Sequence, residues 1–231
     1  MLKGILRDIK DIHSVSVKEG RLLYKLAKEY KGVIVEIGSW KGYSTIWLAK
    51  GSQAGECVKV CTIDPHTGSE VHREMYGVVG TYPELIENIT KANVGNIVVP
   101  MVMTSEQAEK QWGDLPIELL WIDGDHEDIE NDIIRWYPHL SLGGIIALHD
   151  TVAWASMLPY KVAIREIYKS GNFADIKRVG RITYARKVKT LSNGNKLGNR
   201  VALYIRCIYQ VFIPYYTRCL ILGAKCLGRI R

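Results

Sequence analysis

Hydrophobic and polar positions along the chain follow two alternating patterns. Short runs of β-branched and other apolar residues predict buried strands at residues 33–37, 58–63, 97–101, 118–122 and 145–148. Apolar residues spaced by three and four positions predict helices at residues 16–30, 44–50, 83–92, 129–140 and 161–169, with a short helix near Glu106. Ser16 and Glu19 have the spacing of a capping box at the start of the first helix. Because strands and helices alternate, we expect a parallel sheet with helices on both faces. Ligands of such sheets bind beyond the carboxyl ends of the strands.

The pattern changes after the last of these helices. Two strand-like runs, at residues 175–179 and 182–187, have only Gly180 and Arg181 between them, which predicts an antiparallel hairpin. The stretch LSNGNKLGN, at residues 191–199, has the composition of a linker. We therefore divide the chain into an N-terminal helical segment (1–32), a ligand-binding domain (33–189), and a linker with a tail (190–231).

The composition is that of an ordinary globular chain, since 47% of the 231 residues are hydrophobic and 24% are charged. The first residues carry charges every few positions and do not match a signal peptide, which predicts a cytoplasmic location. The five cysteines form no CxxC pair and no zinc-binding spacing. We expect all of them to be reduced thiols: Cys57, Cys61, Cys207, Cys219 and Cys226.

Positive charge is concentrated at the C-terminal end. No acidic residue follows Asp175, so the first 175 residues hold 18 basic and 24 acidic residues, while the whole chain has a net charge of +7. The tail, residues 199–231, combines basic residues with apolar side chains and tyrosines. This combination favours peripheral contact with an anionic membrane, at its inner face for a cytoplasmic protein. A helical pair packed on the domain, a homodimer contact and an RNA contact are the alternatives.

A glycine-containing loop, EIGSWKG, follows the first predicted strand. Glu36 and Gly38 end the strand and Gly42 opens the next helix, whose free N–H groups favour a ligand carboxylate. Asp64 ends the second strand, where a carboxylate can accept hydrogen bonds from both hydroxyls of a ribose. The dinucleotide motif GxGxxG is absent, which favours a nucleoside without pyrophosphate and makes a dehydrogenase the weakest alternative. Glu36 can approach the ammonium group of the ligand. The alternative explanation of the loop is a glycine turn in an α/β domain that binds no ligand.

Three segments, EIGSWKGYST, TIDP and WIDGDHEDIENDIIRWYPHLSLGGIIALHD, resemble the class I S-adenosylmethionine (SAM) dependent methyltransferase superfamily. The resemblance covers about residues 16–189 and is strongest to the sugar and natural-product O-methyltransferases, the branch that includes macrocin O-methyltransferase. It implies an α/β, Rossmann-like fold with a seven-stranded, mostly parallel sheet ending in an antiparallel hairpin. It also implies a set of cofactor-binding residues, from the methionyl end through the ribose to the adenine: Glu36, Gly38, Ser39, Gly42, Asp64, Thr104 and Ser105.

Acidic and histidine residues follow the fourth and fifth predicted strands. Asp123 and His126 come after the fourth strand, and His149 and Asp150 come after the fifth, so the two groups can meet at one site. Methyl transfer to a hydroxyl requires an acceptor oxygen that is at least partly deprotonated. In one interpretation Asp123 and Asp150 bind Mg²⁺. The resemblance implies an acidic or amide pair after the fifth strand in the metal-using relatives, and His149 at the first position of this pair favours a borderline ion such as Mn²⁺.

In the other interpretation no metal binds, and His126 or His149 removes the proton while a neighbouring aspartate orients the ring. Asp125 precedes the helix at 129–140 and is equally well explained as its N-cap. His66, which follows Asp64 and Pro65, is expected to be an exposed loop histidine.

The acceptor is not fixed by any motif. The loops at residues 67–81 and 151–160, the second of which includes Trp154, are the segments expected to line its pocket. The resemblance alone favours a hydroxyl on a sugar, a glycan precursor or another small molecule. A nucleic-acid methyltransferase is the second choice, because the first 175 residues are net negative rather than basic. A non-catalytic SAM-binding protein, anchored through its tail, is the third.

Overall fold

The computed structural model describes residues 6, 15–68, 73–74, 77 and 80–208. Within these residues, seven strands form one sheet with the order β3-β2-β1-β4-β5-β7-β6. The five strands β1 to β5 pair in parallel, and β7 pairs antiparallel with both β5 and β6. The strands are β1 (Val33–Ile37), β2 (Val60–Ile63), β3 (Val98–Met101), β4 (Ile117–Ile122), β5 (Leu140–Leu148), β6 (Phe173–Val179) and β7 (Ile182–Lys187). The predicted α/β fold, with its C-terminal hairpin, is confirmed.

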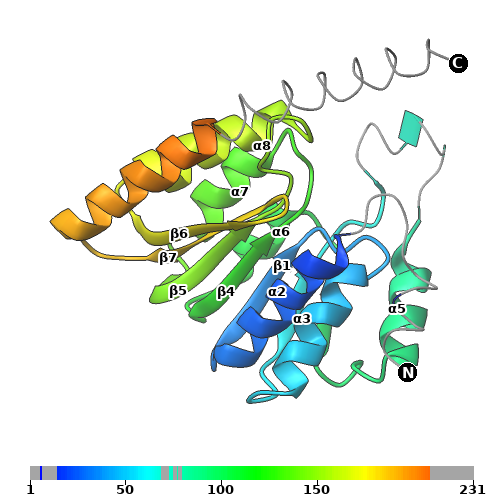
Figure 1. Cartoon of the computed structure of the whole chain (residues 1–231). Helices are drawn as coiled ribbons and strands as arrows, with labels where there is room; N and C mark the ends of the chain where they lie inside the picture. The colour runs from blue at the N-terminus through cyan, green and yellow to red at the C-terminus, as the bar shows by residue number, and fades with distance from the viewer. Residues whose placement is uncertain (1–5, 7–14, 69–72, 75–76, 78–79, 209–231) are drawn as a thin grey trace, which may run out of the picture.

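Helices cover both faces of the sheet (Figure 1). They are α2 (Val17–Glu29), α3 (Tyr43–Gln53), α5 (Tyr82–Lys91), α6 (Ser105–Lys110), α7 (Ile129–Trp136), α8 (Met157–Val162) and the π-helix η1 (Ala163–Lys169). Helix α2 begins with the predicted capping box, in which Ser16 and Glu19 each accept the other's backbone N–H. No helix in these ranges is both long enough and apolar enough to cross a membrane.

Successive residues of the central strands point into two separate hydrophobic cores. Ile34 of β1 and Leu119 of β4 pack with α2, α3 and α5, while Val35 and Leu120 pack with α6, α7 and α8. This arrangement follows from the alternation of side chains along a strand. It also explains why the strands are continuous apolar runs, since both faces are buried.

The predicted boundary between helix α7 and strand β5 was wrong. The prediction continued the helix to Leu140, but α7 ends at Trp136 and Leu140 is the first residue of β5, paired with Ile117. Gly143 and Gly144, which were expected to precede the strand, lie inside it, where the register with β4 shifts. Leu140 has helical spacing from Trp136, but it pairs with Ile117 in the sheet, where its carbonyl accepts a hydrogen bond from Lys187 (2.6 Å).

The predicted linker was also wrong. Residues 193–208 are helical, and this segment, the tail helix, lies on the domain. The side chain of Asn199 is buried and donates a hydrogen bond to the Phe173 carbonyl (2.7 Å), and Ala202 and Leu203 pack against the second core. Residues 199–208 are therefore part of the packed domain. The rest of the predicted membrane-contacting tail, residues 209–231, lies outside the described residues, as do Cys219 and Cys226. The other three cysteines are free thiols.

Candidate active site

The loop after β1 is shaped by two glycines with left-handed backbone conformations. Gly38 has φ +86° and Gly42 has φ +89°, which only glycine adopts at low cost. Gly38 also lies directly against the Asp123 carbonyl, so that a Cβ atom there would overlap it. Between them, Trp40 has φ +48°, a strained conformation for a residue with a side chain. Strain of this kind is most often kept at functional sites.

Asp64 at the end of β2 connects this loop to the neighbouring one. Its Oδ2 accepts the N–H groups of Ser39 (3.0 Å) and Trp40 (2.8 Å), and its Oδ1 accepts the N–H of His66 (2.7 Å). The predicted cofactor residues Gly38, Ser39 and Asp64 are thus brought together. The hydroxyl oxygen of Ser39 is buried without a hydrogen-bond partner in the described part of the chain. A bound ligand could provide the missing partner.

Glu36 lies beneath the loop rather than at its surface. Its carboxylate is fully buried and accepts hydrogen bonds from the hydroxyls of Ser44 (2.6 Å), Thr45 (2.6 Å) and Thr62 (2.7 Å). Burial raises the pKa of Glu36 to about 7, although the three hydroxyl donors oppose that shift. The contacts tie β1 to α3 and β2. In this arrangement Glu36 supports the loop from below.

Thr104 and Ser105 follow β3 and have structural partners. The Thr104 side chain caps helix α6 through Gln107, and the Ser105 hydroxyl accepts the indole N–H of Trp136 (2.8 Å). Their predicted contact with an adenine ring stays a prediction.

His66 is not the exposed loop residue that the sequence suggested. Its side chain is buried, and its Nδ1 lies 2.9 Å from the hydroxyl oxygen of Thr81. Burial lowers the pKa of the imidazole, so the ring is favoured in its neutral form. Because Thr81 immediately precedes helix α5, this contact holds together the two ends of the loop at residues 67–80. No sequence pattern predicts this contact, since Thr81 is 15 residues away along the chain.

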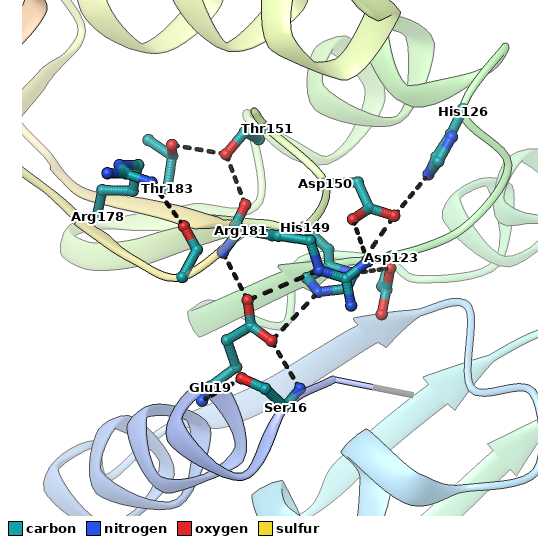
Figure 2. A network of polar contacts seen from close by, with 11 residues as sticks. Ser16, Glu19, Asp123, His126, His149, Asp150, Thr151, Arg178, Arg181 and Thr183 are labelled. Atoms are coloured by element: carbon teal, nitrogen blue, oxygen red, sulfur yellow. Dashed lines mark hydrogen bonds and ion pairs between the residues drawn. The ribbon is translucent and has the colours of Figure 1, made fainter. Parts of the chain in front are cut away.

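Asp123, His149 and Asp150 converge where β4 and β5 end side by side (Figure 2). The Nδ1 atom of His149 lies 2.8 Å from Asp123 Oδ1 and 3.7 Å from Asp150 Oδ2. Only 2% of the His149 side chain is exposed. His126, on the loop after β4, also contacts Asp150, and its Nε2 atom lies 3.3 Å from Asp150 Oδ2. All four residues singled out from the sequence therefore lie in one cluster.

Glu19 is a member of this cluster that the sequence did not reveal. Its side chain is 1% exposed, and its Oε2 atom lies 3.8 Å from Nε2 of His149. Its Oε1 accepts the N–H of Arg181 (2.5 Å), and its Oε2 accepts the N–H of Ser16 (2.6 Å). The N-terminal helix, the end of β5 and the β6–β7 turn therefore meet at one carboxylate (Figure 2).

The turn between β6 and β7 fits closely around Glu19. A Cβ atom at Gly180, which has φ +59°, would overlap the carboxylate. The guanidinium of Arg181 extends past Glu19 to Asp150, with its Nη1 atom 2.7 Å from Asp150 Oδ1. Asp150 itself has φ +47°, a strained conformation at the centre of the cluster. The capping box identified Glu19 from sequence as a helix-start residue, but nothing in the spacing placed it beside residues 149 and 181.

The charges in the cluster determine which groups hold protons. Burial alone would lower the pKa of His149, but Asp123 and the neighbouring carboxylates outweigh it and raise the pKa to about 10. Burial alone would raise the pKa of Glu19, but its contacts with His149, Arg181 and Ser16 lower it to about 2. Near neutral pH the buried imidazole is thus a cation between carboxylates.

The second histidine of the cluster also has a raised pKa. The hydrogen bond to Asp150 raises the pKa of His126, whose side chain is 40% exposed.

The same residues offer ligand atoms for a metal ion. One atom each from Asp123, His149 and Asp150 lie within 4.8 Å of one another. Two carboxylate oxygens and one imidazole nitrogen suit Mn²⁺ or a similar ion better than Mg²⁺, which prefers oxygen alone. Asp125 is not one of these three ligands, and its side chain accepts the N–H of Glu127 (3.1 Å). It is not the N-cap of α7, which is Asp128.

The sequence matches the model of one protein family, a methyltransferase domain, over residues 35–151. The chain belongs to this methyltransferase family. The matched residues include the end of β1, the loop that follows it, Asp64 and the residues of the cluster that follow β4 and β5. Glu19 and Arg181 of the same cluster lie outside the match.

Individual relatives of this methyltransferase chain support the assignment. A catechol O-methyltransferase of Mycobacterium tuberculosis (strain ATCC 25618 / H37Rv) is 30% identical over 142 residues, which cover 60% of this chain and 57% of that protein. The chain thus matches little more than half the length of this relative.

Solved structures show the same fold at lower identity. The O-methyltransferase TomG from Streptomyces achromogenes, in complex with SAM, is 20% identical with a TM-score of 0.60, covering 81% of this chain and 89% of that one. An O-methyltransferase from Bacillus cereus, in complex with SAH, is 23% identical with a TM-score of 0.57, covering 80% and 88%.

Proposed function

We propose that the protein transfers the methyl group of SAM to a hydroxyl group of a small molecule, with a sugar or glycan precursor as the expected acceptor. The observation that carries this proposal is the contact between the loop after β1 and the carboxylate at the end of β2. There, the Asp64 carboxylate already holds the N–H groups of Ser39 and Trp40. A carboxylate at this position suits the hydroxyls of a ribose. The family match and the methyltransferase relatives support the choice of SAM.

The roles of the cofactor-side residues follow from their positions. Gly38 and Gly42 let the methionyl end approach the backbone near the start of α3. The buried hydroxyl of Ser39, which has no partner among the described residues, provides a polar group for the same end of the ligand. Thr104 and Ser105 border the adenine. Glu36 supports the loop through three hydroxyl groups instead of contacting the ligand ammonium group directly.

In the transfer step, the acceptor oxygen bonds to the methyl carbon, the carbon–sulfur bond breaks, and S-adenosylhomocysteine leaves. The hydroxyl proton must pass to a base. Without a metal, His126 is the better base, because its ring is partly exposed and is oriented by Asp150. His149 is almost fully buried, and its two nitrogens face Asp123 and Glu19. We propose that His149 stays protonated and that its positive charge holds the surrounding carboxylates in place.

The alternative with a metal uses Asp123, Asp150 and a deprotonated His149 as ligands. A bound divalent ion would orient the acceptor hydroxyl and lower its pKa. Turnover measured with a chelator, and after adding back Mg²⁺ or Mn²⁺, separates the two routes. Loss and recovery of turnover support the metal route, whereas full turnover in excess chelator supports His126 as the base.

The acceptor class is best determined with SAM carrying a labelled methyl group. The protein is incubated with panels of sugars, glycan precursors, catechols and RNA, and the products are identified by mass spectrometry. Label on a hydroxyl of a small molecule supports the proposal. Label on RNA would support the nucleic-acid alternative, although the negative charge of residues 1–175 argues against it. SAM binding without any labelled product would favour a non-catalytic binding protein.

We also propose that the tail, residues 199–231, contacts an anionic membrane surface. Its apolar and exclusively basic composition supports peripheral binding. Removing the tail at Thr190 is a poor test, because it would also remove the buried contacts of Asn199 and Arg206 with the domain. Cosedimentation of the full chain with anionic and neutral vesicles is the direct measurement. A full chain that stays in the supernatant with both lipids would contradict the proposal.

A further inference from the structure

The tail helix is attached to the domain through a buried arginine. Arg206 is 3% exposed, and its guanidinium lies over the rings of Tyr160 (4.8 Å) and Tyr168 (5.0 Å), on the neighbouring helices α8 and η1. It donates hydrogen bonds to the Thr183 hydroxyl (2.9 Å) and the Thr151 carbonyl. No described carboxylate forms an ion pair with it. Neutral acceptors and aromatic rings therefore stabilise this buried cation.

Arg206 connects the tail helix to the candidate active site. Thr151, whose carbonyl it contacts, directly follows Asp150 and begins the loop expected to line the acceptor pocket. The helix starts far from this point, since Asn199 contacts Phe173 at the first residue of β6. Two turns later Arg206 reaches the strand end where the acid and histidine cluster lies. The tail helix therefore runs toward the edge of the sheet that holds the candidate site.

The opposite face of the tail helix is apolar and exposed. Its large apolar side chains recur at intervals of one, three and four residues, which places them on one helix face. They are Leu197 (64% exposed), Val201 (49%), Tyr204 (68%), Ile205 (59%) and Ile208 (39%). We call these five residues the outer face. Lys196 and Arg200, both exposed, lie at its border, and no acidic residue occurs anywhere after Asp175.

The chemistry of the outer face matches an anionic lipid surface. Apolar side chains enter the boundary region of a bilayer, tyrosine favours the headgroup level, and lysine and arginine are attracted to anionic lipid. A second copy of the chain fits less well, because a symmetric contact brings the same positive charges together. The uniform sign of charge thus favours a membrane over self-association.

We propose that the outer face docks on an anionic bilayer and that Arg206 transmits this docking to the Thr151 loop, so that the acceptor loop is most ordered at the membrane. The idea rests on the proposed function, since it assigns regulation to the same site. Isolated helices depend on packing for most of their stability, so a surface that binds the outer face also stabilises the contacts of the inner face.

The test uses the full chain with vesicles of phosphatidylglycerol and phosphatidylcholine, and with vesicles of phosphatidylcholine alone. Cosedimentation measures binding, and hydrogen exchange of residues 150–156, which precede helix α8, measures loop order, so neither readout needs SAM or an acceptor. We expect binding to the anionic vesicles only, weakened by salt, and exchange in the loop slowed by about tenfold, equivalent to 1.4 kcal/mol.

Two sets of variants separate docking from its transmission. Val201→Glu with Ile205→Glu should abolish vesicle binding, whereas the matched control, Ile134→Glu with Leu142→Glu, places the same charges at two exposed apolar positions elsewhere and should bind normally. Arg206→Lys should bind vesicles but lose the slowed exchange. If it unfolds, Thr183→Val removes one acceptor of Arg206 without changing the tail.

Several results would overturn the proposal. These are absence of binding to anionic vesicles, equal loss of binding in the control pair, or binding that leaves loop exchange unchanged. A concentration-dependent dimer that is dissociated by the outer-face variant would assign the surface to a second copy instead. A protein that docks and orders its loop but methylates no acceptor would contradict the proposed function and leave this inference standing.

Discussion

The two halves of the candidate site are built from different polar groups. On the cofactor side, the carboxylates Glu36 and Asp64 are held by hydroxyl and backbone N–H donors. On the acceptor side, Asp123 and Asp150 are held mainly by the charged groups of His149 and Arg181. Glu19 lies near the same two charged groups and also accepts two backbone N–H groups. Neutral donors fix a shape, whereas charges in a buried site also fix where a proton or cation can reside. Substitutions on the two sides should therefore affect different steps.

The largest effect is expected at Asp123. Asp123→Asn should lower turnover by at least about 100-fold, because both the metal route and the imidazolium arrangement depend on this carboxylate. SAM affinity should change little, since the side chain points to His149 and not to the nucleoside site. Turnover and calorimetry together measure the two quantities. Asp125→Asn, two residues away, is the matched control and should retain turnover. Equal losses of turnover and SAM affinity would remove the distinction between the halves.

Asp64→Ala should have the opposite signature. It removes a charged acceptor from the ribose position and from the N–H groups of Ser39 and Trp40, so SAM binding should weaken by roughly 1.5 to 3 kcal/mol. Turnover at saturating SAM should fall much less than in Asp123→Asn. Calorimetric titration with SAM gives the affinity, and Asp114→Ala, at an exposed position, is the control. Unchanged affinity would exclude Asp64 as the ribose ligand.

Glu19→Gln tests whether the N-terminal helix belongs to the acceptor half. The neutral amide keeps the size of the side chain but removes the negative charge beside His149. Because His149 then positions Asp123 and Asp150 less well, turnover should fall by about tenfold, while SAM affinity stays unchanged. Ser16→Ala is the control, because it removes the serine side of the capping box and leaves the Glu19 carboxylate beside His149 and Arg181. If both variants lose turnover only in proportion to their thermal stability, Glu19 is merely structural.

The smallest effect is a pH dependence of stability at Glu36. The pKa of this carboxyl is raised from 4.5 to about 7 in the folded protein, so its stabilising contribution is complete below pH 4.5 and is lost as the pH rises through 7. Urea unfolding at several pH values should show wild type losing stability relative to Glu36→Gln over this interval. A difference between the two proteins that stays constant with pH would show that the hydroxyl groups keep Glu36 ionised.

Much of the fold could be predicted from sequence because its signals are local. The strand at residues 182–187 was predicted at its observed bounds, and the start of α2 followed from the spacing of Ser16 and Glu19. The cluster at residues 123, 126, 149 and 150 followed from one topological rule, that adjacent parallel strands end at the same edge.

The errors arose where distant contacts decide the structure. The glycines and asparagines of LSNGNKLGN have the composition of a linker, but the buried contacts of Asn199 and Arg206 stabilise a helix there. His66 became buried through Thr81, and Glu19 entered the site through a turn 162 positions away. None of these contacts has a periodic signal in the sequence.

The most direct test of the central claim is a calorimetric titration of the full chain with SAM, S-adenosylhomocysteine and NAD. A preformed site for a nucleoside without pyrophosphate predicts that SAM and S-adenosylhomocysteine bind at one site per chain, that Asp64→Ala weakens both, and that NAD does not bind. Binding of NAD, or the absence of binding by SAM and S-adenosylhomocysteine, would contradict the account.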